Sequence, residues 1–159
     1  MRLINVAPQS QEWPEFIQLS FQYIGENWPQ AIKGQTSDDF FQEYGQELLH
    51  RISQGTRGLF LIKEKGGTIG LANVYIEWEC LNIAEFYIKP ANRRKGFGTK
   101  ALEEVIHWGR LNRCRTVRAE VDKSLEKANQ FWYQCLDSLN ASGERCVYSK
   151  PIANMKTQI

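Results

Sequence analysis

The chain has 159 residues, of which 42% are hydrophobic and 24% are charged, with 12 Gly and 5 Pro. This length is typical of one domain with its own core, and the composition excludes collagen-like and largely disordered chains. The net charge of +2 hides an asymmetry. Residues 1–50 carry seven acidic and two basic side chains (−5), whereas residues 51–159 carry eleven acidic and eighteen basic ones (+7). Such an asymmetry is a clue to the charge of the partners.

The cysteines lie far apart, and no histidine lies near one at the spacing of metal ligands. They are Cys80, Cys114, Cys135 and Cys146. We therefore expect reduced thiols in a cytoplasmic protein and no metal site. Residues 1–8 lack the basic and apolar regions of a signal peptide, and no apolar run is long enough to cross a bilayer.

The first part of the chain is predicted to be mainly helical. Residues 2–7 form a short strand that ends at Pro8, and apolar side chains at helical spacing predict a helix over 10–28. A second helix is predicted over 37–53, because residues 37–39 resemble an N-cap region with acidic side chains in the first turn.

The hydrophobic period then changes to that of strands. Residues 58–63 and 69–78 are predicted to form a β-hairpin, and a third strand over 81–88 is stopped by Pro90. The remaining predicted elements are a helix over 98–111, a strand over 116–121, a helix from Ser124 that includes Leu139, a turn at 141–143 and a strand over 145–152. The order β-α-α-β-β-β-α-β-α-β predicts one α/β domain over 1–152 with some parallel pairing, followed by a loose tail over 153–159.

The strongest functional signal is the segment 85–100, which reads as a strand, a basic loop and a first helical turn. No acidic residue occurs from Lys89 to Leu102. Free N–H groups at a helix start bind phosphate, and Gly96 and Gly98 let the backbone approach an anion. The Walker A spacing is not present. Residues 96–101 fit the form of the dinucleotide fingerprint that ends in Ala, but no strand that ends in an acidic residue lies in the right place about twenty residues on. The residues alone indicate either a phosphate cradle or a plain strand-to-helix turn with solvated basic neighbours.

The run 93–98 resembles the R/Q-x-x-G-x-G/A motif of the GNAT superfamily of N-acetyltransferases, and residues 85–90 resemble the strand before it. The element order over 58–136 is also similar. The resemblance implies the GNAT fold, which is a single mixed, mostly antiparallel sheet with flanking helices. It also implies an acyltransferase that moves the acetyl group of acetyl-CoA, or another acyl group from CoA, to a primary amine. With no cysteine placed as a covalent relay, we expect direct attack in a ternary complex.

The resemblance also assigns a donor site. Backbone N–H groups of 94–99 would hold the pyrophosphate, and the backbone of 86–88 would pair with the pantetheine arm. An N–H near Tyr87 or Ile88 would polarise the thioester carbonyl, which would lie where this strand splays from 118–121. The implied cofactor-binding residues are Phe86, Tyr87, Ile88, Arg93, Arg94, Lys95, Gly96, Phe97, Gly98, Thr99, Asn129 and Trp132.

The last predicted helix resembles the family's N-x-x-A-x-x-F-[YW] segment at three positions and departs from it at Leu125, where Asn is usual. Trp132 takes the place that often holds a tyrosine acid for the departing thiolate, and an indole N–H cannot deliver a proton. We therefore assign the acid role to the adjacent Tyr133 and a substitute cofactor contact to Asn129. Core packing of Phe131 and Trp132 and solvation of Asn129 are the alternatives.

The acceptor amine must lose a proton, which at pH 7 costs about 4.6 kcal/mol for an ammonium of pKa ~10.4. Glu85 is the candidate base because it lies on the strand beside the expected thioester. The alternative is an ion pair with Arg118. Weaker candidate bases are Glu77, Glu79, Glu120 and Asp122. Helix capping competes with substrate binding for Asp38, Asp39 and Glu43, and core packing competes with an acceptor pocket for Trp28, Phe40 and Tyr44.

Two other functions compete with this interpretation. Departures at Leu125 and Trp132 favour a non-catalytic acyl-CoA-binding or regulatory module on the same fold. The basic residues between 93 and 118 suggest a nucleic-acid surface, which neighbouring acidic residues interrupt, so we expect neither a nucleic acid nor a membrane as partner. The basic excess is expected at the phosphates of CoA, and the acidic excess of 1–50 at the acceptor. The sequence leaves open the acceptor, the acyl-chain preference and a homodimer.

Overall fold

The computed structural model describes residues 1–136 and 138–153. The described residues form one seven-stranded sheet with the strand order β1-β2-β3-β4-β5-β7-β6. The strands are β1 (Arg2–Asn5), β2 (Thr56–Glu64), β3 (Gly67–Glu77), β4 (Cys80–Ile88), β5 (Thr116–Asp122), β6 (Ser138–Ser142) and β7 (Arg145–Pro151). The helices are α1 (Trp13–Asn27), α2 (Ser37–Ser53), α3 (Phe97–Leu111) and α4 (Glu126–Cys135), with short 3-10 helices η1 (Pro29–Ile32) and η2 (Pro90–Asn92).

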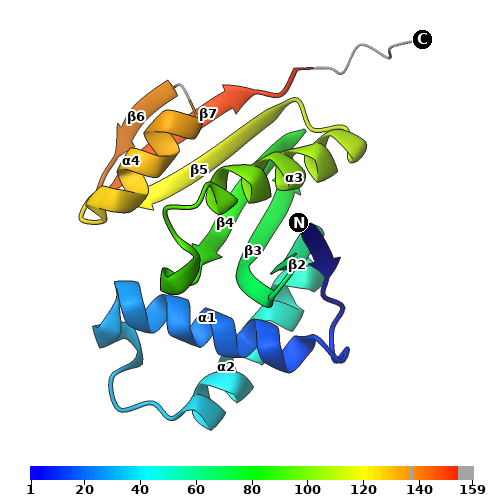
Figure 1. The fold of residues 1–159 in the computed structure, drawn as a ribbon, viewed down its shortest axis with the longest axis vertical. Helices are drawn as coiled ribbons and strands as arrows, with labels where there is room; N and C mark the ends of the chain where they lie inside the picture. Colours follow the sequence, from blue (N-terminus) through cyan, green and yellow to red (C-terminus); the bar gives the residue numbers. More distant parts are fainter. Residues whose placement is uncertain (137, 154–159) are drawn as a thin grey trace.

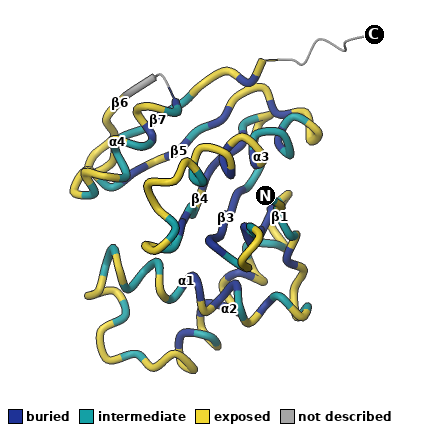
Figure 2. The backbone as a smooth tube through the Cα atoms, in the orientation of Figure 1, coloured by how far each residue is buried: buried dark blue, intermediate teal, exposed yellow. Residues whose placement is uncertain are grey.

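The helices form two layers, one on each face of the sheet (Figure 1). Apolar side chains of α1 and α2 pack on one face against Leu59, Leu61 and Leu71 of β2 and β3. On the other face, α3 and α4 pack against alternate strand residues such as Phe60 and Ala72. Figure 2 shows that buried positions run along the central strands, whereas the loops are largely exposed. This arrangement is the predicted α/β class, with the sheet mixed and mostly antiparallel.

The sheet opens between β4 and β5. These two strands are parallel and pair only over residues 80–83 and 116–119. On the other side of β4 the pairing with β3 continues to Ile88, with a register shift that leaves Ala84 as an extra, bulged residue. Backbone groups of residues 84–88 that point toward β5 therefore have no strand partner among the described residues. The predicted parallel pairing is confirmed, and the splay lies where it was expected.

Three local predictions need correction. The cap of α2 is Thr36 rather than Ser37, because the Thr36 hydroxyl accepts from the Asp39 N–H in a capping box. Ser124 does not cap α4, since its N–H and hydroxyl both donate to the Asp122 carboxylate. The last helix ends at Cys135, and residues 138–142 form strand β6, which pairs with β7 around a turn at Gly143. The predicted tail lies outside the described residues from position 154 onward.

Candidate active site

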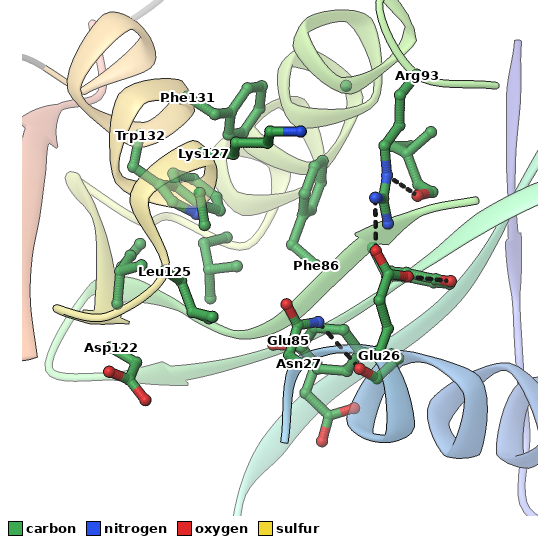
Figure 3. A pocket seen from close by; sticks show the side chains of 18 of the residues that line it. Glu26, Asn27, Glu85, Phe86, Arg93, Asp122, Leu125, Lys127, Phe131 and Trp132 are labelled. Atoms are coloured by element: carbon green, nitrogen blue, oxygen red, sulfur yellow. Dashed lines mark hydrogen bonds and ion pairs between the residues drawn. The ribbon is translucent and has the colours of Figure 1, made fainter. Parts of the chain in front are cut away.

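A cleft of about 1370 Å³ lies where β4 and β5 separate. Its walls come from the second half of β4, the end of β5, the C-terminal end of α1, the loop before α3 and one face of α4. Figure 3 shows Phe86 of β4 facing Phe131 and Trp132 of α4, with Glu26 and Asp122 on different walls. Of the residues predicted to bind the donor, Phe86, Tyr87, Ile88, Arg93, Arg94, Gly96, Phe97, Gly98, Thr99 and Trp132 line this cleft.

The loop before α3 has the features of an anion site. Gly96 is the N-cap of α3 and has a φ of 78°, a left-handed conformation that a side chain would disfavour. A Cβ on Gly98 would lie 3.1 Å from the Phe131 ring, so glycine there allows α3 and α4 to pack closely. The first turn of α3 contains no acidic residue, and its first N–H groups have no intrahelical acceptor. The residues present therefore fit a pyrophosphate. Lys95 does not line the cleft.

Arg93 is not a mobile surface charge. Its Nε donates to the Ile88 carbonyl oxygen at 2.8 Å, and its Nη1 binds the Glu26 carboxylate at 2.6 Å. The Tyr87 hydroxyl donates to the other Glu26 oxygen at 2.9 Å, and the guanidinium lies over the Tyr87 ring. Burial alone would raise the pKa of Glu26, but the bonds from Arg93 and Tyr87 outweigh it and lower that pKa. Glu26 thus ties α1 to β4 and to the donor loop.

Glu85 is half-buried in the cleft wall, directly after the bulged residue of β4. The Tyr44 hydroxyl of α2 lies 2.6 and 2.7 Å from its two carboxylate oxygens. Burial raises the pKa of Glu85, although the Tyr44 bond and the charges of Arg51 and Arg57 oppose the shift. The ion pair with Arg118 is not formed, since Arg118 pairs with Glu120 at 2.7 Å.

Helix α4 presents only one of its two candidate residues to the cleft. Trp132 is 6% exposed and packs edge-on against Phe86 and Phe131. Tyr133 is 61% exposed and lines a separate shallow groove with Lys123 and Cys146. Neighbouring helical residues point about 100° apart, so a helix that buries Trp132 turns Tyr133 to solvent. The prediction of Tyr133 as the acid is therefore corrected.

Asn129 also lies outside the cleft lining and has a structural role. Its amide nitrogen donates to the carbonyl oxygens of Asp122 and Leu125, and its side-chain oxygen accepts from the Tyr148 hydroxyl at 2.8 Å. These bonds join the start of α4 to β5 and β7. With its donor and acceptor groups engaged, Asn129 is not placed as the substitute cofactor contact that was expected.

Sequence reasoning offered Trp28 for an acceptor pocket but missed Tyr23 and Glu26 of α1, which also line the cleft. Tyr23, Glu26 and Trp28 line it together, and Trp28 Nε1 donates to Asp122 on the opposite wall at 2.9 Å. Their spacing of three and five residues at the end of one helix was the available signal. Glu26 is also the one acidic residue of 1–50 in the lining, which otherwise takes its acids from later segments. Asp39 belongs to the capping box of α2 instead. The expectation that the acidic excess of 1–50 borders the acceptor stays a prediction.

Neither a metal cluster nor a membrane helix is found in the part of the chain that the structure describes. No group of three or more His, Cys, Asp or Glu side chains there could hold a metal ion. No helix in residues 1–136 and 138–153 is both long and apolar enough to cross a membrane.

Comparisons with known proteins identify the family of this chain. Residues 18–136 match the family described as acetyltransferase (GNAT) family. No curated protein matches the sequence significantly. Among solved structures, an acetyltransferase of the GNAT family from Staphylococcus aureus has a TM-score of 0.70 at 12% identity, covering 96% of this chain and 100% of that one. An acetyltransferase from Thermus thermophilus has a TM-score of 0.67 at 20% identity, covering 94% and 96%.

A third similar structure was solved with a ligand. The PaiA N-acetyltransferase of Thermoplasma acidophilum, in complex with coenzyme A, has a TM-score of 0.68 at 14% identity and covers 95% of this chain and 99% of that one. At these identities the structures show a common fold, and the family match over 18–136 carries the assignment. The chain belongs to the GNAT family of acetyltransferases, which are acetyl-CoA-dependent acyltransferases.

Proposed function

We propose that this chain transfers the acetyl group of acetyl-CoA to a primary amine by direct attack in a ternary complex. One observation carries the proposal: a single cleft contains both an anion-binding helix start and the Glu85 carboxylate, which lie at the two ends of the same unpaired strand edge. The first provides for the phosphates of the donor, and the second provides a base for the acceptor.

The residues at the donor end of the cleft would orient the thioester of acetyl-CoA. Free N–H groups at the start of α3 would bind the pyrophosphate, with Arg94 near it. Backbone groups of 86–88 would pair with the pantetheine arm, as an added strand does. An N–H of this edge, near Tyr87 or Ile88, would stabilise the oxyanion that forms when nitrogen attacks the thioester carbon.

The proton balance of the proposed reaction needs one base from the protein. The ammonium first gives one proton to Glu85, directly or through a water. The neutral amine nitrogen then forms the new C–N bond while the C–S bond breaks, and the second N–H proton is released to solvent. The leaving thiolate is a fairly stable anion, because thiol pKa values lie near 8.5, and it takes its proton from solvent. No cysteine lines the cleft among the described residues, which supports direct attack over a covalent relay.

Release of free thiol from acetyl-CoA, measured with a panel of primary amines, tests the activity. We expect turnover with at least one amine and a large loss in Glu85→Gln, of the order of 100-fold or more, as for other general bases. CoA affinity should not change in that variant, since Glu85 lies away from the phosphate loop. Wild-type turnover by Glu85→Gln at neutral pH would contradict the role of Glu85.

The donor site is tested by Gly96→Asp, which places a carboxylate at the helix start where the pyrophosphate is expected. We expect CoA binding, measured by calorimetry, to be lost. Gly66→Asp is the matched control, because Gly66 lies in the β2–β3 turn with open space around it. Unchanged CoA affinity in Gly96→Asp would contradict the proposed site.

A second candidate is a non-catalytic module that binds acyl-CoA. It is favoured by Trp132, which presents an indole to the cleft where the family often has a tyrosine. The thiol-release assay separates the two functions. Tight CoA binding with no turnover on any amine would favour the module.

A further inference from the structure

Among the residues that the structure describes, the Glu85 carboxylate has a single direct partner, and that partner is a phenol. The Tyr44 hydroxyl lies 2.6 Å from one carboxylate oxygen and 2.7 Å from the other. A phenol has one proton, so the hydroxyl shares it between both oxygens and holds the end of the carboxyl group beside α2. No Lys or Arg nitrogen in the described part of the chain lies within ion-pair distance of Glu85.

Tyr44 is itself held firmly. Its side chain is 7% exposed on α2, and its ring stacks on Phe40 with centroids 4.8 Å apart and ring planes 16° apart. The two rings pack against α1, where Phe21 contacts Phe40. The packing of α1 and α2 thus sets the position of the Tyr44 hydroxyl beside Glu85 of β4.

We propose that Tyr44 is a positioning residue that orients Glu85 and keeps it ionised for taking the proton of the acceptor amine. This inference rests on the proposed function, in which Glu85 is the base. Tyr44 gives up no proton in the step. One N–H bond of the amine breaks, the proton bonds to a Glu85 oxygen, and the Tyr44 hydroxyl continues to donate to the carboxyl group.

The charged and titratable groups around Glu85 act on it without contacting its carboxylate, whereas the neutral Tyr44 phenol contacts it directly. Tyr23 of α1, Glu47 and Arg51 of α2 and Arg57 of β2 act on it from a distance. Arg57 is engaged elsewhere, since its Nη1 donates at 2.7 Å to Asn73, the residue opposite Glu85 on β3.

A direct arginine pair would hold a carboxylate ionised too firmly for it to accept a proton. A phenol orients the carboxylate without adding a full charge. Burial raises the pKa of Tyr44 well above its ordinary value, so this hydroxyl stays protonated and remains a donor at neutral pH.

The pH profile of kcat/KM for Tyr44→Phe tests the inference. Phenylalanine keeps the ring and its stacking but removes the donor, which destabilises the ionised carboxylate. We expect the acidic limb to move to higher pH by about one unit. The rate would fall about tenfold below that limb and much less on the plateau. Tyr75→Phe is the matched control, because the ring of Tyr75 lies under the Arg57 guanidinium and its hydroxyl is not a partner of Glu85 among the described residues. The acidic limb of this variant should match that of the wild type.

The outcomes separate this inference from the proposed function. If Glu85→Gln keeps the wild-type rate, Glu85 is not the base and both fail. If Glu85→Gln is inactive but the acidic limb of Tyr44→Phe is unmoved, or its rate falls equally at all pH values, only the role of Tyr44 fails. Site-specific 3-fluorotyrosine at position 44 covers the case in which Tyr44→Phe does not fold. It is a stronger donor of nearly the same size, so the acidic limb should move to lower pH, and an unmoved limb would overturn the inference.

Discussion

The substitution Glu26→Gln measures how much the contacts between α1 and the donor loop contribute to stability. In Glu26→Gln the charge is lost while the shape is kept. The ion pair joins side chains that are 39% exposed in Arg93 and 33% exposed in Glu26, so solvent screening limits its worth to about 0.2–1 kcal/mol. The bond from the Tyr87 hydroxyl is weaker to an amide than to a carboxylate. We expect a loss of about 1 kcal/mol in stability and a Tm lower by about 2–4 °C.

The dependence of this effect on pH identifies its cause. The pKa of folded Glu26 is lowered, so its stabilisation is present above the unfolded pKa of about 4.3 and is lost as the pH falls through the folded value. The Tm difference between wild type and Glu26→Gln should be complete at pH 7 and should shrink below about pH 4. Thermal melting across this range measures it, with the exposed Glu43→Gln as control. A difference that stays constant with pH, or none at pH 7, would refute the reasoning.

Three further substitutions probe the backbone and the cleft walls. Gly70→Ala would place a Cβ 2.1 Å from the Tyr87 carbonyl oxygen, so we expect a loss of about 3 kcal/mol, and a Tm within 2 °C of wild type would contradict this packing. Gly96→Ala meets no neighbour but forces a side chain into the left-handed region, which should cost about 1–2 kcal/mol in denaturant unfolding; no loss would mean that this φ is not kept. Trp28→Phe removes the main cause of the lowered pKa of Asp122, so NMR titration should find that pKa raised, and an unchanged value would show that the bond is absent in solution.

The donor loop could be predicted from the sequence because its physics is local. A strand, two glycines and a helix start lie within sixteen consecutive residues, and each glycine has a physical reason for its identity. Gly96 adopts a positive φ, and Gly98 makes room for the Phe131 ring. The reason for Gly96 is local, whereas the reason for Gly98 depends on the packing of α4. The direction of the helix N–H groups follows from the local backbone.

The surroundings of Glu85 and Arg93 could not be predicted in this way. Tyr44 and Glu85 are 41 positions apart, and Glu26 and Arg93 are 67 apart, so these contacts depend on how α1 and α2 dock on β4. The spacing of residues along the sequence does not predict how these helices pack on the sheet.

The errors near the C-terminal end have a different origin. Leu139 lies four positions after Cys135 and therefore fits a helical face, yet the chain has already turned into β6. Tyr133 was assigned to the cleft although it is next to Trp132 in a helix, and only one of two such neighbours can face the same wall.

The narrow junction between β4 and β5 has a consequence for how the molecule assembles. Strands β2, β3 and β4 follow one another as hairpins, whereas β5 is reached only after the whole of α3. Closing that longer connection costs more chain entropy and returns only four residue pairs. The antiparallel strands β1–β4 and the antiparallel strands β5, β7 and β6 can therefore form early and separately. The pairing of β4 with β5 is then a late event. The cleft exists only once they are joined, so a partly folded chain has no binding site to occupy, and ligands that bind there select the completed sheet.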